Sequence, residues 1–203
     1  MIINNLFSVP IVFFDISDDI IKKTLSRVNT FIDEKTDWRS KTILGETFTT
    51  YHIEKNFLGK IECVDLLNEI NENVRHFLEL IGKDPTIGLE IDTWVNFNPP
   101  GTGHQMHEHF GSLASGVIYL EAGNDSGDLV FYDPINLRTQ SNSHNPGLIY
   151  KKNDFNFTNY RLKPQTNRMV IFEGWLYHSV DYNKTDKNRI SISFNVGELR
   201  GEN

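Results

Sequence analysis

Cysteine is almost absent from this chain: Cys63 is the only one in 203 residues, so no internal disulfide can form. A chain of this length buries a sizeable core without covalent cross-links. The lack of disulfides is typical of a reducing compartment, and we therefore expect a cytoplasmic protein. Cys63 lies among Ile61, Val64 and Leu67, a setting that predicts a small buried apolar side chain rather than a nucleophile.

Basic residues are scarce as well. The 20 Lys and Arg are outnumbered by 27 Asp and Glu, which gives a net charge of -7. Nucleic-acid surfaces need clustered Lys and Arg, so nucleic acid is not expected as the main partner. The first residues lack the basic segment and apolar core of a signal peptide, and no apolar run reaches the length of a membrane span. We expect a soluble protein without a membrane partner.

Two amphipathic helices are predicted in the N-terminal part, after a short strand at 11–14. Ser17 and Asp18 supply a cap and an acidic first turn for the first helix. Its apolar residues follow helical spacing: Ile21, Leu25, Val28 and Ile32. A second helix is predicted from about Lys60 to Leu80, with Gly82 as its stop signal. Its apolar positions are Val64, Leu67, Ile70, Val74, Phe77 and Ile81.

From Ile87 onward the apolar residues recur at every second position, which indicates strands. After the run at 87–97, further strands are predicted at 114–120, 129–132, 148–150, 169–172 and 189–196, separated by turn-forming Gly, Pro, Asn and Asp. About eight strands after two helices favour a mainly β fold, a jelly-roll-like barrel with helices on one face. We expect one domain, with helical support over about 15–82 and the jelly-roll core over about 87–197.

The segment His107-Glu108-His109 is the most informative motif. In an extended strand, residues two apart point to the same face, so His107 and His109 can hold one metal ion together while Glu108 points away. His178 is the candidate third ligand. Three protein ligands leave coordination positions open, which is typical of a catalytic metal rather than a structural one. A turn-rich approach at 98–104 places the pair at a strand start beside a loop.

The last predicted strand has one polar and one apolar face. Arg189, Ser191, Ser193 and Asn195 alternate with Ile190, Ile192, Phe194 and Val196. A half-exposed strand with its polar face in water explains this pattern in most proteins. In the mouth of a barrel, however, Arg189 and Ser191 would clamp a carboxylate, because a guanidinium binds it in fork geometry and the hydroxyl adds a donor.

These segments together resemble the iron(II)- and 2-oxoglutarate-dependent oxygenases, whose fold is the double-stranded β-helix, a cupin-like jelly roll. The similarity covers roughly 87–197. It runs in family order through Trp94-Val-Asn96, His107-Glu-His109, Ser115-Gly-Val-Ile-Tyr119, Gly127-Asp-Leu-Val-Phe131, His178 and Arg189-Ile-Ser-Ile-Ser-Phe-Asn195. The same segments look most similar to a branch of this family that is found in phages and bacteria.

The resemblance implies that His107 and His178 bind iron(II) and that Arg189 pairs with the far carboxylate of 2-oxoglutarate. It further implies a cofactor-binding role for Ser191, Tyr119 and Asn96, although a core aromatic is an equal reading of Tyr119. The implied reaction consumes dioxygen and 2-oxoglutarate, releases succinate and CO2, and hydroxylates a small molecule or a protein side chain. Edge strands of such barrels often pair, so a homodimer is compatible with the fold.

One residue departs from the commonest family pattern, because His109 stands where an Asp is expected. Three readings remain: a three-histidine site, a two-histidine site that recruits water or Glu108, and a degenerate site. The first is favoured because His109 has the right strand parity. His104 is expected outside the ligand set, in the approach loop, facing a ligand or the substrate.

Two other classes of protein share some of these features. A cupin-like three-histidine metalloenzyme would act on its substrate without 2-oxoglutarate, but it has no need of the Arg189-Ile-Ser191 clamp. A non-catalytic jelly-roll binding module would not require three histidines and an arginine at these spacings. The loops that would select the prime substrate, 47–57 and 137–157, carry no recognisable signal.

Overall fold

The structure is a computed structural model that describes residues 8–33, 39–42, 45–135, 144, 147, 151, 153 and 155–199. The strand predicted at 148–150 lies outside these residues. The helices are α1 (Asp18–Asp33), α2 (Phe57–Lys60) and α3 (Val64–Leu80). The strands are β1 (Val12–Asp15), β2 (Arg39–Thr42), β3 (Gly45–Thr49), β4 (Leu89–Asn98), β5 (His104–His107), β6 (Ala114–Glu121), β7 (Leu129–Tyr132), β8 (Asn159–Leu162), β9 (Arg168–Phe172), β10 (His178–Val180) and β11 (Arg189–Glu198).

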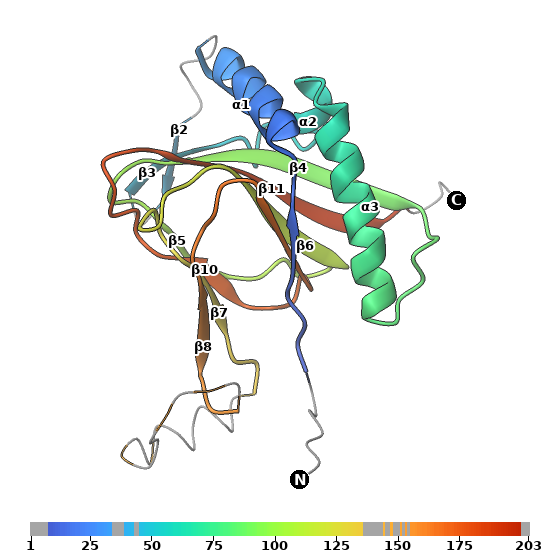
Figure 1. Cartoon of the computed structure of the whole chain (residues 1–203), viewed down its shortest axis with the longest axis vertical. Helices are drawn as coiled ribbons and strands as arrows, with labels where there is room; N and C mark the ends of the chain where they lie inside the picture. Colours follow the sequence, from blue (N-terminus) through green and yellow to red (C-terminus); the bar gives the residue numbers. More distant parts are fainter. Residues whose placement is uncertain are drawn as a thin grey trace.

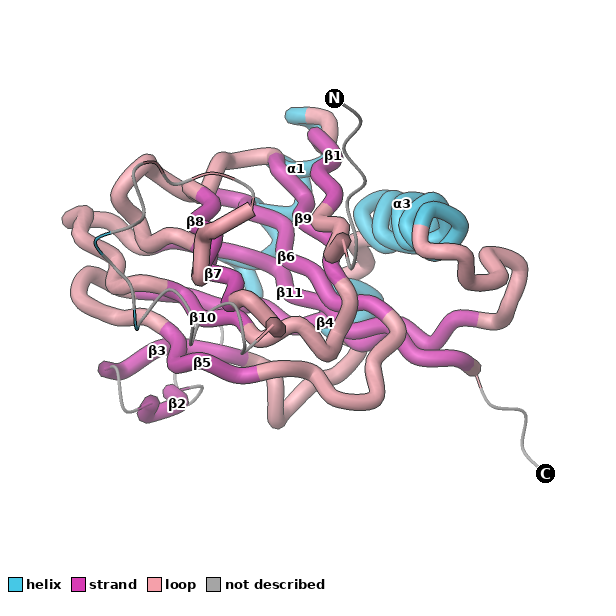
Figure 2. Tube along the Cα trace, turned by 90° about the horizontal axis from the view of Figure 1, so that it is seen from below, coloured by secondary structure: helices cyan, strands magenta, loops and turns pink. Residues whose placement is uncertain are grey.

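The strands form two antiparallel sheets that face each other. The larger sheet has seven strands in the order β1-β9-β6-β11-β4-β3-β2, and the smaller has four in the order β5-β10-β7-β8. From β4 onward the strands alternate between the two sheets, except that β7 and β8 pair within the smaller one, so this part of the chain winds as a double-stranded β-helix (Figure 1). Helices α1 and α3 cover the outer face of the larger sheet, and Figure 2 shows α3 beside that sheet from below. The predicted jelly-roll fold with bracing helices is confirmed.

The period of two along the strands separates two cores. On β11, Ile190, Ile192, Phe194 and Val196 pack toward the helices, in one cluster with Leu66, Ile70, Val74 and Phe77 of α3. The intervening residues of β6 and β9, among them Tyr119, Val170 and Phe172, face the smaller sheet. They form a second cluster with Leu129 and Phe131 of β7 and with Leu176. Because the first core holds the larger sheet rigid, the polar residues of β11 present a fixed inner face.

The predicted start of the second helix, at about Lys60, is wrong, because α3 begins at Val64. The helical segment is broken at 61–63, where Cys63 N–H bonds to the Leu58 carbonyl and Glu62 takes a φ of 54°. The break shifts the helical phase, so Val64 is 55% exposed and Leu66 is buried in its place. Cys63 is buried as expected, and burial raises the pKa of its thiol.

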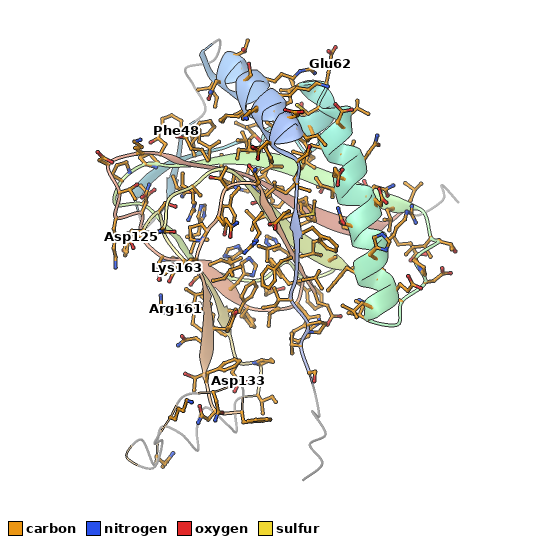
Figure 3. All side chains as sticks on the ribbon, viewed as in Figure 1. Phe48, Glu62, Asp125, Asp133, Arg161 and Lys163 are labelled. Carbon is orange, nitrogen blue, oxygen red and sulfur yellow. The ribbon has the colours of Figure 1, made fainter. Side chains whose placement is uncertain are left out.

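Charged residues lie at both ends of the molecule. Glu62 lies at the helical end, whereas Arg161 of β8 and Asp133 lie at the end away from the helices (Figure 3). Arg161 forms an ion pair with Asp181 and lies 4.0 Å from Asp128.

Within the described parts of the chain, no helix has the length and apolar character needed to cross a bilayer.

Candidate metal centre

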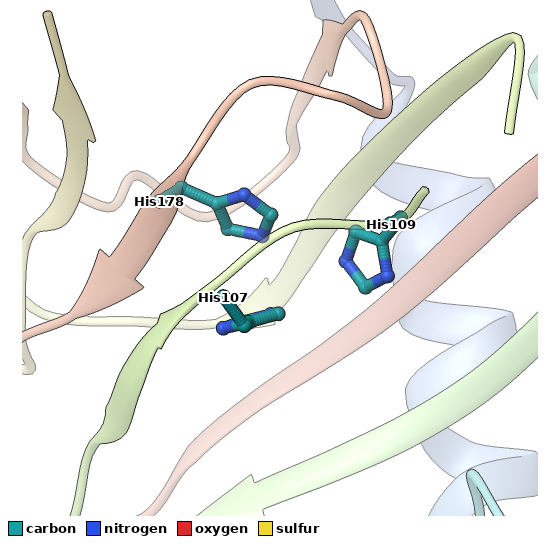
Figure 4. Close-up of side chains that lie close together, drawn as sticks. All are labelled: His107, His109 and His178. Atoms are coloured by element: carbon teal, nitrogen blue, oxygen red, sulfur yellow. The ribbon is translucent and has the colours of Figure 1, made fainter. Parts of the chain in front are cut away.

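Three histidines come together between the two sheets. His107 is the last residue of β5 and is the register partner of His178, the first residue of β10. His109 follows in the turn after β5, and one ring nitrogen from each residue lies within 4.8 Å of the others (Figure 4). The expected strand start was wrong, because the pair lies where β5 ends. The imidazoles nevertheless converge as the i, i+2 spacing predicted.

The turn after β5 is fixed by its backbone. His109 N–H donates to the Gly174 carbonyl at 2.8 Å, and Ser112 N–H donates to the His109 carbonyl at 3.1 Å. Gly111 closes the turn with a φ of 90°, a conformation that favours glycine. His109 is therefore positioned by the loop before β10 rather than by a strand ladder.

Two of the imidazoles have their tautomers set by backbone carbonyls. His107 Nδ1 donates to the Gln105 carbonyl at 2.7 Å, and His178 Nδ1 donates to the Leu176 carbonyl at 2.9 Å. A carbonyl can only accept, so Nδ1 of each ring bears a proton, and in the neutral form of the ring the lone pair lies on Nε2. This pattern is typical of metal-binding histidines, whose second nitrogen is held by a carbonyl or carboxylate.

Arg189 lines the same cavity and is only 2% exposed. Its Nη1 donates to the carbonyls of Ser126 and Gly127 at 3.1 and 3.0 Å, and its Nη2 donates to Asn98 Oδ1 at 2.7 Å. Its Nε is buried and has no hydrogen-bond partner among the residues that the structure describes. No carboxylate pairs with Arg189 among the described residues, so the cavity contains an uncompensated positive charge.

The model of the family described as "Putative 2OG-Fe(II) oxygenase" matches residues 92–195, just over half of the chain. The chain belongs to this family of 2OG-Fe(II) oxygenases. The matched segment contains the three histidines and Arg189, and the resemblance inferred from the sequence motifs is confirmed. No curated protein matches the chain.

Solved structures of other 2OG-dependent proteins share the fold at low sequence identity. The epimerase SnoN from nogalamycin biosynthesis, in complex with Fe3+, alpha ketoglutarate and nogalamycin RO, is 12% identical, with a TM-score of 0.68 over 94% of this chain and 79% of that one. A Pseudomonas putida prolyl-4-hydroxylase is 14% identical, with a TM-score of 0.61 over 96% and 95%. A Trichoplax adhaerens prolyl hydroxylase bound to a hypoxia-inducible-factor peptide is 14% identical, with a TM-score of 0.63 over 93% and 83%.

In this 2OG-Fe(II) oxygenase two of the clustered histidines, His109 and His178, are held in the neutral form. Burial, followed by the charge of His107, lowers the pKa of His109 to about 4 and that of His178 to about 3. These two rings are therefore uncharged near neutral pH, so a metal does not meet an imidazolium charge at either of them. Within the described part of the chain, these three histidines are the only such group, and Glu108 is not a member of it.

The other predicted site residues line the same cavity. Tyr119, Asn96 and Ser191 all contribute to its wall, together with Trp94 and Ser193. The amide of Asn96 donates to Ser193 Oγ at 2.9 Å. Burial raises the pKa of Tyr119 to about 12, so its hydroxyl keeps its proton. The structure thus brings all seven predicted residues into one cavity, and their individual roles stay predictions.

Sequence reasoning missed Asn98. Asn98 is the register partner of Arg189 and accepts from its Nη2, while its own Nδ2 donates to His104 Nε2 at 3.0 Å. Burial, followed by the charges of Arg189 and His107, lowers the pKa of His104 to about 4, so the ring stays neutral and can accept. His104 thus belongs to β5 and not to a loop. The strand alternation that placed Asn96 on the inner face also predicts Asn98 there, two residues on.

The residues present fit the two groups in the family's name. Three imidazole nitrogens within 4.8 Å of one another suit a divalent transition metal such as iron(II). The unbonded Nε of buried Arg189 suits a carboxylate, since an unpaired buried donor is costly and an anion would satisfy it. The three histidines and Arg189 line one cavity, as a site that held both groups together would require.

Proposed function

We propose that this chain is an iron(II)- and 2-oxoglutarate-dependent dioxygenase that hydroxylates a C–H bond of a second substrate and releases succinate and CO2. The observation that carries the proposal is the buried Arg189, whose Nε lacks a partner, in the same cavity as the three histidines. A three-histidine enzyme that works without 2-oxoglutarate has no use for this uncompensated cation.

The proposal gives each residue one task. His107, His109 and His178 hold iron(II), which supplies the oxidation chemistry with dioxygen when bound. Arg189 binds the far carboxylate of 2-oxoglutarate, with Ser191 and Tyr119 as further hydrogen-bond donors. The protonated hydroxyl of Tyr119 can donate to a carboxylate without adding negative charge to the cavity. Asn96 completes the polar wall on the cosubstrate side.

The prime substrate is proposed to be a small molecule or a protein side chain. Proteins of the same fold include prolyl hydroxylases, one of them bound to a peptide, and an epimerase bound to nogalamycin RO. Either kind of substrate would approach the open side of the three-histidine cluster. We favour hydroxylation as the reaction type, because it needs no catalytic group beyond the metal, 2-oxoglutarate and dioxygen.

The test is the slow turnover of 2-oxoglutarate that needs no prime substrate. Iron(II) and 2-oxoglutarate are supplied to wild type, His109→Asp and His109→Ala, and succinate and oxygen uptake are measured. We expect turnover in wild type, some in the Asp variant, which restores the common ligand type, and almost none in the Ala variant. Iron content and circular dichroism of His107→Ala and His178→Ala serve as controls, with metal lost and fold retained.

Each alternative gives a different result in these assays. Oxygen uptake without succinate would indicate a metalloenzyme that does not use 2-oxoglutarate. No oxygen uptake in wild type would indicate a binding module. Full activity of His109→Ala would show that His109 is not a ligand.

A further inference from the structure

The third histidine of the cluster differs from the other two in the group that its Nδ1 faces. Backbone carbonyls fix His107 and His178 with the proton on Nδ1. Nδ1 of His109 instead faces the side-chain amide of Asn195, 3.3 Å from its Nδ2. An amide has a donor end and an acceptor end, so it can accommodate either tautomer of the imidazole.

The observed orientation of Asn195 keeps His109 in the tautomer that does not bind a metal. Ser115 Oγ donates to Asn195 Oδ1 at 2.8 Å, which leaves Nδ2 directed at His109. Because Nδ2 is a donor, Nδ1 of the neutral ring accepts, and the proton lies on Nε2. Nε2 is the nitrogen left for a metal, and a protonated ring nitrogen has no lone pair to offer.

We propose, resting on the function proposed above, that Asn195 and Ser115 form a two-position relay that switches His109 between a proton-bearing and a metal-binding tautomer. When a metal enters, the amide of Asn195 turns over. His109 Nδ1–H then donates to Oδ1, and Nδ2 donates to Ser115 Oγ. The proton leaves Nε2 for water and another is taken up at Nδ1, so the ring stays neutral and no net proton is released.

The relay is available because every atom in it has a partner in both positions. The Ser115 hydroxyl donates in one position and accepts in the other, at no loss of hydrogen bonds. Asn195 and Ser115 are register partners on β11 and β6, so the sheet ladder holds them opposite each other. The backbone bond from His109 to Gly174 holds the ring beside the amide.

The consequence is an ordered assembly of the metal site. His107 and His178 have free Nε2 atoms before the metal arrives, whereas His109 is recruited by it. Asn195 is thus a positioning residue, which acts through His109 and not on substrate. It matters in this chain because an imidazole has two tautomers, whereas the carboxylate more common at this position has none.

The tautomers can be read directly by nuclear magnetic resonance of protein with ¹⁵N-labelled histidine, metal-free and loaded with Zn(II). We expect His107 and His178 to carry the proton on Nδ1 in both states. We expect His109 to carry it on Nε2 without metal and on Nδ1 with Zn(II). A His109 ring with Nδ1–H in the metal-free protein overturns the relay. If Zn(II) leaves all three rings unchanged, the proposed metal site fails as well; if it perturbs only His107 and His178, the relay alone fails.

Substitutions at Asn195 give a second readout that does not depend on turnover. Asn195→Asp replaces the amide with an acceptor-only group, so His109 should carry Nδ1–H before metal is added. Its Zn(II) affinity, measured by competition with a chromophoric chelator, should rise by about tenfold, and that of Asn195→Ala should fall by about tenfold. Asn96→Asp is the matched control, because it adds the same charge to the cavity wall without facing an imidazole in the structure. Equal affinities of the two Asp variants would reject the relay.

Discussion

At the scale of single residues, the ability of the cavity to bind an anion depends on the orientation of the Arg189 guanidinium. Two backbone carbonyls and Asn98 hold its Nη1 and Nη2, and this leaves Nε as the group without a partner. Asn98 is in turn fixed at its other side by His104, and its carbonyl accepts from Asn183 at 2.8 Å. The cation is therefore oriented by neutral groups only, so its charge stays available to a ligand.

The first prediction separates the charge of Arg189 from its orientation. Arg189→Ala removes charge-assisted hydrogen bonds worth about 1.5–3 kcal/mol each, so 2-oxoglutarate should bind at least about tenfold more weakly. Arg189→Lys should not restore binding, because an ammonium lacks the planar fork. Asn98→Ala keeps the charge but frees the guanidinium, at a cost of about 1 kcal/mol or roughly fivefold in affinity.

Anaerobic calorimetric titration of 2-oxoglutarate into iron-loaded protein measures these effects. Ser193→Ala is the control, since its hydroxyl lines the cavity and contacts Asn96 but not Arg189. Wild-type affinity in Arg189→Ala would refute the anion site. Wild-type affinity in Asn98→Ala would show that the backbone carbonyls orient Arg189 without help.

At the scale of secondary-structure elements, the turn after β5 and the loop before β10 carry the site. Gly174 lies where the two segments meet. A Cβ atom at this position would lie 2.7 Å from the Ser112 carbonyl oxygen and 2.8 Å from that of His109. Backbone atoms cannot move aside as a flexible side chain would, so only glycine fits between the two segments.

Gly174→Ala should therefore displace the turn that carries His109. We expect a loss of stability of about 1–3 kcal/mol, typical of overpacking, and a fall in Zn(II) affinity of about tenfold to a hundredfold. Gly197→Ala is the matched control, because an added Cβ there meets nothing within 4 Å. Chemical unfolding and chelator competition on both variants test the effect. An unchanged metal affinity in Gly174→Ala would mean that the turn does not fix His109.

Elements with strong periodicity were predictable from the sequence. The first helix and the long strands of the larger sheet were found because their apolar faces repeat clearly over many residues. The strands β2, β3, β8 and β10 were missed because they are short and mostly polar, whereas the equally short β1, β7 and β9 were found from their apolar runs. The break before α3 was missed because Ile61 and Cys63 continue an apolar pattern while hydrogen bonding across 58–63 interrupts the helix.

The convergence of the three candidate ligands was predictable from the sequence, whereas the groups that support them were not. Alternation on β11 and the spacing of His107 and His109 follow from strand geometry alone. The contacts from Asn98 to Arg189 and from Asn195 to His109 depend on strand register. The amino-acid sequence alone does not specify which residue of β4 or β6 lies opposite a given residue of β11.

At the scale of the whole molecule, burying neutral histidines couples the fold to pH. Burial is the largest cause that lowers the pKa of His104 and His109 to about 4 and of His178 to about 3. In the unfolded chain these rings bind protons below their ordinary pKa of about 6.5. Between that value and about pH 4, the unfolded state of the metal-free protein holds more protons than the folded state. The stability that these neutral rings contribute is therefore fully present above the unfolded pKa, and it is lost as the pH falls toward the folded pKa values.

This linkage predicts a steep pH dependence of the free energy of unfolding. The contribution of one of the three rings can be measured by substitution. Each histidine contributes up to about 1.4 kcal/mol per pH unit to the slope of the unfolding free energy in this window. His178→Asn removes one of the three titrating rings, so its slope should be shallower than that of wild type by about one proton. Urea unfolding of both proteins with chelator present, from about pH 7 to about pH 4.5, gives the two slopes. Carboxylates titrate equally in both proteins, so the difference isolates His178, and identical slopes would show that folding does not lower the pKa of its ring.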